Sequence, residues 1–324
     1  MDLLSLVLTL APLQAPPPDA ALPLWWGRAA HALLLNTVRR YDERLAESLH
    51  NDQGPRPFTA SSLLGRFPAG NLDPARSYTL RFTAFQGELV AILMKAAQTD
   101  GPLAPGAQIE LDYLPFRILA VQPSNLISDG EFPIAKFPIP NSQSEFPNPQ
   151  SSSPNPQSAI RNSQSVWSAL TSYQELSAPY LLAKLTPPRR ITFQFASPTS
   201  FKSGGMHIPL PLPELVFNSL LERWNAYAPV LFPPETRRYA AECLALSRYR
   251  LSSRSIPVKS LGMRVGGVGE ATYISLNYDR YWMSVISVLA RFAMFSGVGA
   301  GASMGLGQCR LKEEGVSPPA AEES

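Results

Sequence analysis

A histidine and an arginine six residues apart are placed where acid–base chemistry on a phosphate ester can occur. His50 lies at the predicted end of a helix, just before the turn Gly54-Pro55, and Arg56 follows that turn. Histidine exchanges protons near neutral pH because its ordinary pKa is about 6.5, and the guanidinium fork of arginine fits the oxygens of a phosphate. Such a pair could act on a phosphodiester, with proton transfer at His50 and charge stabilisation at Arg56. An exposed histidine that stabilises the last carbonyls of its helix is an equally good interpretation.

The glycine-rich stretch from residue 297 to residue 307 is the strongest feature of the sequence. Its candidate phosphate-binding residues are five glycines and a serine, namely Gly297, Gly299, Gly301, Ser303, Gly305 and Gly307. Glycine allows backbone N–H groups to approach an anion closely. The loop follows a helix and precedes a strand, which is the reverse of a dinucleotide-binding fingerprint, and it has no Walker lysine. A tight connection without a ligand is the alternative interpretation.

Basic residues gather in the second half of the chain, between residues 237 and 264. Seven arginines and lysines lie in this span against one acid, although the net charge of the whole chain is only +3. Arg248 and Arg250 alternate along a predicted strand and share one of its faces, which predicts a track for RNA phosphates. Tyr249 then points to the opposite face, where a core position is expected. A solvated charged face is the alternative for the two arginines.

The remaining histidines and the cysteines give weaker indications. His31 falls within the first predicted helix and is expected to be packed, as is Tyr41 on the apolar face of that segment. His207 follows a Gly-Gly turn, where it could touch RNA or nothing. Cys243, Cys309 and the histidines form neither a zinc spacing nor a disulfide framework, which favours a reducing cytoplasm and no metal or other cofactor. No run approaches the ~18 apolar residues of a membrane span, so no membrane partner is expected.

Hydrophobic periodicity places these residues on two successive strand–helix–strand units. Apolar residues at three- and four-residue spacing from 30 to 49 predict helical structure, in which Asp42 caps a second, short helix. Further helices are expected over 88–97, 215–227 and 281–295, and strands over 4–10, 78–85, 109–121, 191–195, 243–251, 271–276 and 308–311. Two such units predict an α+β protein made of two sandwiches, each with an antiparallel sheet.

The chain divides into four segments. We expect an N-terminal domain over residues 1–122, which carries the candidate histidine, and a C-terminal domain over 166–312 with the glycine-rich loop. Between them, residues 123–165 form a polar low-complexity insertion in which Pro-Asn-Pro-Gln-Ser occurs twice. Such a composition cannot bury enough apolar surface to fold, so we expect an inserted loop or linker. The tail over 313–324 is expected to be disordered.

Four stretches of the chain resemble the CRISPR repeat-processing endoribonucleases of the RAMP superfamily. They are Leu49-His50 with Pro57-Phe58-Thr59-Ala60-Ser61, then Tyr78 to Thr83, then Phe195 to Lys202, and finally the glycine-rich loop with its ending Met304-Gly305-Leu306-Gly307-Gln308. The resemblance covers most of the chain outside the insertion and the tail. It implies two tandem ferredoxin-like (RRM-like) domains, a catalytic role for His50, and RNA binding by the loop and Lys202.

The resemblance also implies an activity and partners. Such an enzyme binds CRISPR precursor RNA and cleaves within each repeat without a metal, leaving a 5′-hydroxyl and a 2′,3′-cyclic phosphate. Repeat RNA, before and after processing, is the expected partner, with other CRISPR effector proteins and a second copy of the chain as further candidates. The alternative is a non-catalytic RAMP subunit that binds guide RNA in an effector complex.

One departure from the family pattern lies in the loop itself. Family members often carry a basic residue there, where this chain has Ala300-Gly301-Ala302. Phosphate contact is then expected from backbone amides, from Ser303 and from side chains elsewhere in the chain.

Overall fold

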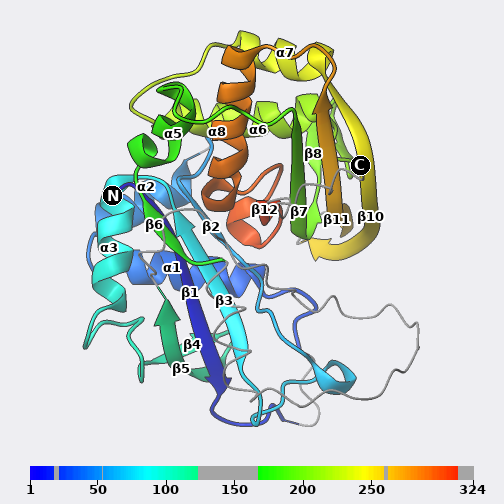
Figure 1. The fold of residues 1–324 in the computed structure, drawn as a ribbon. Coiled ribbons are helices and arrows are strands. Elements are labelled where there is room, and N and C mark those ends of the chain that lie inside the picture. Colours follow the sequence, from blue (N-terminus) through cyan, green and yellow to red (C-terminus); the bar gives the residue numbers. More distant parts are fainter. Residues whose placement is uncertain (18–21, 53, 123–166, 259–261, 313–324) are drawn as a thin grey trace, which may run out of the picture.

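The computed structural model describes residues 1–17, 22–52, 54–122, 167–258 and 262–312. They form an α+β architecture with antiparallel sheets in two domains, which lie one above the other in Figure 1. The predicted insertion over 123–165 and the predicted tail over 313–324 lie outside the described residues. Among the helices of the described ranges, none has the length and apolar character needed to cross a membrane.

The first sheet is built around β1 (Leu3–Pro12). The other strands of its main path are β2 (Phe58–Ala60), β3 (Tyr78–Ala84), β4 (Gln108–Leu111) and β5 (Leu114–Gln122), in the order β2-β3-β1-β5-β4. Alternate residues of β1 face opposite sides of the sheet. Its even-numbered leucines join a core with α1 (Gly27–Arg39) and α3 (Gly87–Ala97), and Ser5 on the other side contacts the buried Arg81. Because both faces are covered, β1 is an almost continuous apolar run.

A short strand, β6 (Ala169–Thr171), continues the line of β5 along β1. Gln122 pairs with Val7 at the end of β5, and Ala169 pairs with Ser5 at the start of β6. The Ser168 hydroxyl donates a hydrogen bond to the Gln122 carbonyl, so the two ends of the undescribed segment meet. The first sheet therefore includes three residues that lie beyond the expected start of the second domain at residue 166.

The second sheet has the strand order β10-β11-β7-β12. Its strands are β7 (Arg190–Thr199), β10 (Leu244–Val258), β11 (Gly262–Ser275) and β12 (Cys309–Lys312), and a hairpin of β8 (Phe201–Ser203) and β9 (Met206–Ile208) follows β7. The helices of this domain are α5 (Tyr173–Leu181), α6 (Pro213–Tyr227), α7 (Glu235–Cys243) and α8 (Arg280–Ser296). Phe292 of α8 meets Phe85 of the first domain and Trp224 of α6 edge to face, with ring centroids 5.5 and 5.3 Å apart. The apolar face of α8 thus serves both domains (Figure 1).

A buried arginine fastens the two domains together. Arg81 of β3 donates hydrogen bonds to Ser5 Oγ at 2.8 Å, to Gln308 Oε1 at 2.6 Å and to the Met294 carbonyl in α8. Burial lowers the pKa of Arg81 to about 9. A buried cation is stable only while its acceptors stay in place. Arg81 therefore holds α8 and the residue just before β12, which lie on either side of the glycine-rich loop, against the first sheet.

The predicted α+β class with antiparallel sheets is confirmed, and each predicted helix and strand falls on an observed element. The stretch 109–121 is wrong as a single strand, because it folds into the β4–β5 hairpin. Asp112 and Tyr113 form its two-residue turn with φ of 50° and 67°, in the left-handed region that such turns use. The long strands β10 and β11 extend well beyond the predicted 243–251 and 271–276, and β2, β6, the β8–β9 hairpin, α5 and α7 were not predicted.

Candidate functional site

The candidate histidine lies in the last turn of α2 (Glu43–Asn51). The Asp42 carboxylate accepts a hydrogen bond from the Leu45 amide at 2.8 Å, so the helix begins where its predicted cap lies. Leu49 is buried on the inner face of α2, which leaves His50 exposed on the outer face. The imidazole is therefore open to a strand of RNA.

The turn after α2 returns Arg56 to the end of that helix. The Tyr227 hydroxyl of α6 donates a hydrogen bond to the Pro55 carbonyl, so the second domain also holds this turn. Arg56 Nη2 then donates to the His50 carbonyl oxygen at 3.2 Å. The structure thus brings the two predicted catalytic residues together, with the guanidinium beside the backbone of His50.

His31 of α1 connects this pair to the glycine-rich loop. Its Nδ1 lies 2.9 Å from the Ser303 carbonyl oxygen, and its Nε2 lies 3.3 Å from Arg56 Nη1. Arginine nitrogens only donate hydrogen bonds, so Nε2 must be unprotonated and Nδ1 carries the hydrogen that Ser303 accepts. The ring is half-buried and lies 5.4 Å from that of Phe58, centroid to centroid. The sequence predicted a packed residue here and gave no sign of its polar contacts.

The pKa of His31 lies below its ordinary value, chiefly because burial disfavours the charged ring. The hydrogen bond to Ser303 opposes this shift, and the charges of Arg56 and His50 add to it. The lowered pKa keeps His31 neutral at pH 7, which is the state that both of its hydrogen bonds require.

The first domain holds one end of the glycine-rich loop, at the single turn η2 (Ala302–Met304). Trp25 Nε1 donates to the Met304 carbonyl at 2.8 Å, and Ser61 forms a bridge with Gly305. Gly305 has a φ of 93°, and a Cβ built there would lie 2.9 Å from the Ser62 amide nitrogen. Only glycine fits this conformation and this close approach.

The second domain holds the other end of the loop through a polar pair on α6. Arg223 Nη2 donates to the Gly299 carbonyl at 2.6 Å, and the Gly299 amide donates to Ser219 Oγ at 2.8 Å. The Ala300 amide donates to the Ser200 carbonyl at 2.8 Å. Ser219 and Arg223 are four residues apart on a predicted helix, a spacing that places them on one face without revealing what they bind.

The amides of the loop fall into two groups. Those of Gly297, Gly299 and Gly307 donate to protein acceptors and maintain the loop itself. Those of Gly301, Ala302 and Ser303 are used by no hydrogen bond within the described residues. Consecutive amides of this kind can bind an anion.

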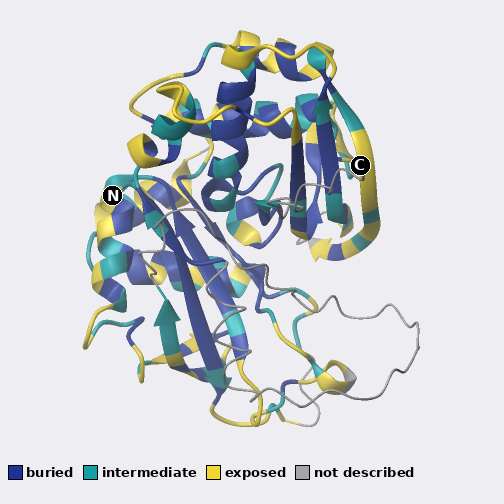
Figure 2. Ribbon diagram, in the orientation of Figure 1, coloured by how far each residue is buried: buried dark blue, intermediate teal, exposed yellow. Residues whose placement is uncertain are grey.

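The basic residues predicted to bind RNA are all exposed, and within the described residues no hydrogen bond or ion pair joins them to His50 or Arg56. Lys202 lies on β8, and Arg248 and Arg250 lie two residues apart on β10. The predicted core position of Tyr249 is wrong, because this side chain is 64% exposed. β10 is an edge strand of its sheet, and Figure 2 shows most of this strand as exposed.

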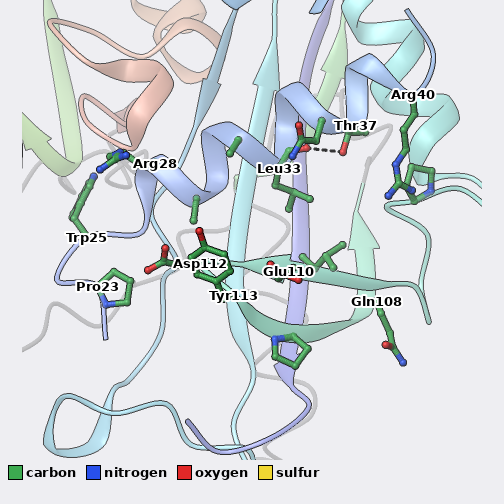
Figure 3. A pocket seen from close by; sticks show the side chains of 16 residues that line it. Pro23, Trp25, Arg28, Leu33, Thr37, Arg40, Gln108, Glu110, Asp112 and Tyr113 are labelled. Atoms are coloured by element: carbon green, nitrogen blue, oxygen red, sulfur yellow. Dashed lines mark hydrogen bonds between the residues drawn. The ribbon is translucent and has the colours of Figure 1, made fainter. Parts of the chain in front are cut away.

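A groove of about 840 Å³ runs beside α1 and the β4–β5 hairpin (Figure 3). Trp25 and Arg28 line one end of it, and Asp112 and Tyr113 of the hairpin turn lie across from them. His31, His50 and Arg56 do not line this groove. Trp25 lines the groove and also donates its hydrogen bond to Met304 of the glycine-rich loop.

Within the described ranges, no group of three or more histidine, cysteine, aspartate or glutamate side chains is placed to hold a metal ion. Cys243 and Cys309 are both free thiols.

Two antiparallel α+β domains, joined at a glycine-rich loop before the last strand, define a RAMP-like fold. Two solved structures of Cas6 product complexes share it, each 25% identical in sequence. One covers 97% of this chain and 100% of its own with a TM-score of 0.66, and the other covers 96% and 99% with a TM-score of 0.68.

Sequence comparison gives the family. A model described as CRISPR-associated endoribonuclease Cas6 matches residues 193–309, and one described as CRISPR Cas6 N-terminal domain matches residues 3–83. The CRISPR-associated endoribonuclease Cas6 of Mycobacterium tuberculosis is 34% identical over 126 residues, which are 38% of this chain and 39% of that protein. The chain thus matches less than half the length of this relative. The protein belongs to the Cas6 family of CRISPR-associated endoribonucleases.

Proposed function

We propose that this protein binds the repeat RNA of a CRISPR precursor and cleaves it once per repeat, by general acid–base catalysis without a metal. Family membership supports the substrate class, and related Cas6 structures are described as product and substrate mimic complexes. The observation that carries the chemistry is the convergence of His50, Arg56 and the glycine-rich loop through His31.

In this mechanism the attacking group is the 2′-hydroxyl of the nucleotide before the scissile phosphate. Its oxygen forms a bond to phosphorus as the bond to the 5′-oxygen of the next nucleotide breaks, giving a 2′,3′-cyclic phosphate and a 5′-hydroxyl. One proton leaves the 2′-hydroxyl and one reaches the departing 5′-oxygen, and the exposed imidazole of His50 carries one of these two transfers.

Arg56 stabilises the negative charge that gathers on the phosphate. Its guanidinium has five N–H donors, of which the structure shows two nitrogens directed to His31 and to the His50 carbonyl. The remaining donors are available to phosphate oxygens. A guanidinium fixed in advance loses little on reaching the transition state, which is the condition for effective electrostatic catalysis.

We further propose that both domains are ferredoxin-like, over residues 1–122 and 166–312. The order of the main elements is strand, helix, strand, strand, helix, strand in each: β1, α1, β2, β3, α3 and β5 in the first, and β7, α6, β10, β11, α8 and β12 in the second. The additions to this order are α2 and β4 in the first domain, and β6, α5, the β8–β9 hairpin and α7 in the second. The strand orders β2-β3-β1-β5 and β10-β11-β7-β12 then correspond position by position.

The direct test is incubation of the purified protein with end-labelled repeat RNA in excess EDTA, with an RNA of unrelated sequence as control. We expect one cut per repeat, which chelation does not suppress. Loss of cleavage in EDTA and its return with a divalent ion would contradict the mechanism. Tight binding of the repeat without any cut would instead support a non-catalytic subunit that holds guide RNA.

A further inference from the structure

The glycine-rich loop contains no lysine or arginine, yet a guanidinium from another strand lies against it. Residues 297–307 are glycine, alanine, valine, serine, methionine and leucine only. Arg264 of β11 approaches the loop at Gly301, where an added Cβ would lie 3.2 Å from Arg264 Nη1. Gly301 also has a φ of 83°, which side chains rarely adopt. No side chain of the loop therefore covers the Arg264 guanidinium at Gly301.

No partner among the described residues explains the position of Arg264. Within the described residues, no hydrogen bond or ion pair involves its guanidinium, and burial lowers its pKa. By contrast, Lys312 of β12 in the same sheet has an acidic partner, since its Nζ pairs with Glu270 of β11 at 2.7 Å. A half-buried guanidinium without an acceptor has lost part of its hydration and gained nothing in return.

Two further basic side chains lie close to Arg264. The pKa of His207 is lowered, chiefly by burial and then by the charges of Arg264 and Lys202. Lys202 and His207 face each other across the β8–β9 hairpin, and β9 contacts β11. We call Lys202, His207 and Arg264 the basic cluster. No ion pair joins any of the three to a carboxylate in the part of the chain that the structure describes.

We propose that Arg264 binds an RNA phosphate at the glycine-rich loop and supplies there the positive charge that the loop itself lacks. The proposal rests on the proposed function and assigns a residue to it. Gly301 leaves the guanidinium uncovered, and the fork of donors can engage two oxygens of one phosphodiester. Lys202 adds charge nearby, which attracts the same backbone without fixing it.

The test measures affinity for repeat RNA over a series of salt concentrations, with a 2′-deoxy nucleotide at the cleavage site so that the RNA stays intact. Each phosphate contact contributes roughly 0.7–0.9 to the slope of log K against log salt, or about fivefold in affinity near ~0.15 M salt. We expect Arg264→Ala and Arg264→Gln to lose one such contact. The matched control is Arg238→Ala, which removes an exposed arginine that pairs with Glu242 on α7.

A relocated charge tests the position of the contact. Ala300 is half-buried in the loop beside Gly301, so Ala300→Lys places a cation on the loop itself. Added to Arg264→Ala, it should restore the lost slope. Failure of this double variant to recover, or a wild-type slope in both single variants at an unchanged melting temperature, would overturn the proposal. If the wild-type protein shows no salt-dependent binding of repeat RNA, the proposed function itself fails.

Discussion

The two sides of the candidate site differ in how their polar groups are partnered. On the first-domain side, Arg56 donates to His31 and to the His50 carbonyl, so these residues fix one another. On the second-domain side, Arg264 and the amides from Gly301 to Ser303 have no hydrogen-bond partner within the described residues. Groups aligned in advance suit a transition state, and unpartnered donors suit an anion that arrives from solution. We therefore expect the first side to govern the rate of cleavage and the second side to govern affinity.

The largest effect should come from His50→Ala. Removal of a proton-transfer group typically lowers a rate by ~10²–10⁴, whereas one imidazole adds little to an affinity that many phosphate contacts share. Single-turnover cleavage should fall at least a hundredfold while the dissociation constant for repeat RNA stays near that of wild type. Glu47→Ala, on an exposed position of the same helix, is the control. Wild-type cleavage by His50→Ala would move the proton transfer to another residue, with His31 the next to test.

Arg56→Ala should lower both the rate of cleavage and the affinity for RNA, because a guanidinium on the phosphate acts in the ground state and in the transition state alike. Loss of one hydrogen-bonding charge is expected to lower the rate by roughly tenfold to a hundredfold, and affinity should fall as well. Arg56→Lys keeps the positive charge but loses the forked pair of guanidinium donors, so its cleavage rate should lie between those of wild type and Arg56→Ala. A change in rate without any change in affinity would show that Arg56 acts only on the transition state.

His31 offers a smaller and more specific test. His31→Gln places an oxygen where Nε2 lies and can still accept from Arg56, whereas His31→Asn places an amide N–H where Nδ1 lies and can donate only to Ser303. If His31 acts by positioning Arg56, the Asn variant should cleave about tenfold more slowly than the Gln variant. Combined with Arg56→Ala, either change should then add little further loss. Equal rates for the two single variants would reduce His31 to a packing role.

The pH dependence of this contact has a definite sign. Burial lowers the pKa of folded His31, so its contact with Arg56 is intact at neutral pH and is lost on acidification. The unfolded chain takes up the proton first, so the free energy of unfolding should fall as the pH drops from about 6.5 toward the lowered pKa. Thermal unfolding of wild type and His31→Gln across this range should show the difference, and identical pH profiles would contradict it.

The smallest effect should come from the edge strand. Arg248→Ala and Arg250→Ala are expected to weaken RNA binding and to reduce the salt slope by roughly one unit per lost contact at most, with no effect on saturated cleavage. Arg238→Ala again provides the control. An unchanged slope would mean that the exposed face of β10 does not follow the RNA backbone.

The first-domain side of the site is the part that local sequence could predict. Asp42 marked the start of α2, and the spacing of apolar residues placed Leu49 inside and His50 outside. Arg56 follows His50 by only six residues, across a turn, so the sequence predicts that the two residues lie near each other. The helix cap, the apolar spacing and the turn each depend on a few neighbouring residues, and tertiary packing does not override these local preferences here.

The rest of the site depends on contacts that sequence periodicity does not encode. Ser303 is 272 residues from His31, and Arg264 is 37 residues before the glycine that it approaches. The alternation rule placed Tyr249 in the core, but the rule assumes a regular strand with one covered face. The register of β10 shifts between Leu246 and Arg248, and residues 247–250 are exposed on both faces, so the rule fails there.

In the proposed mechanism the nucleophile is the 2′-hydroxyl of the RNA, and this protein supplies proton transfer and charge stabilisation. The most direct measurement compares repeat RNA with the same RNA carrying a single 2′-deoxy nucleotide before the scissile phosphate, both in EDTA. We predict equal affinity for the two RNAs, a 2′,3′-cyclic phosphate on the natural product, and no cleavage of the deoxy substrate. Cleavage of the deoxy RNA at the same bond would contradict the account, because water rather than the 2′-hydroxyl would then be the nucleophile.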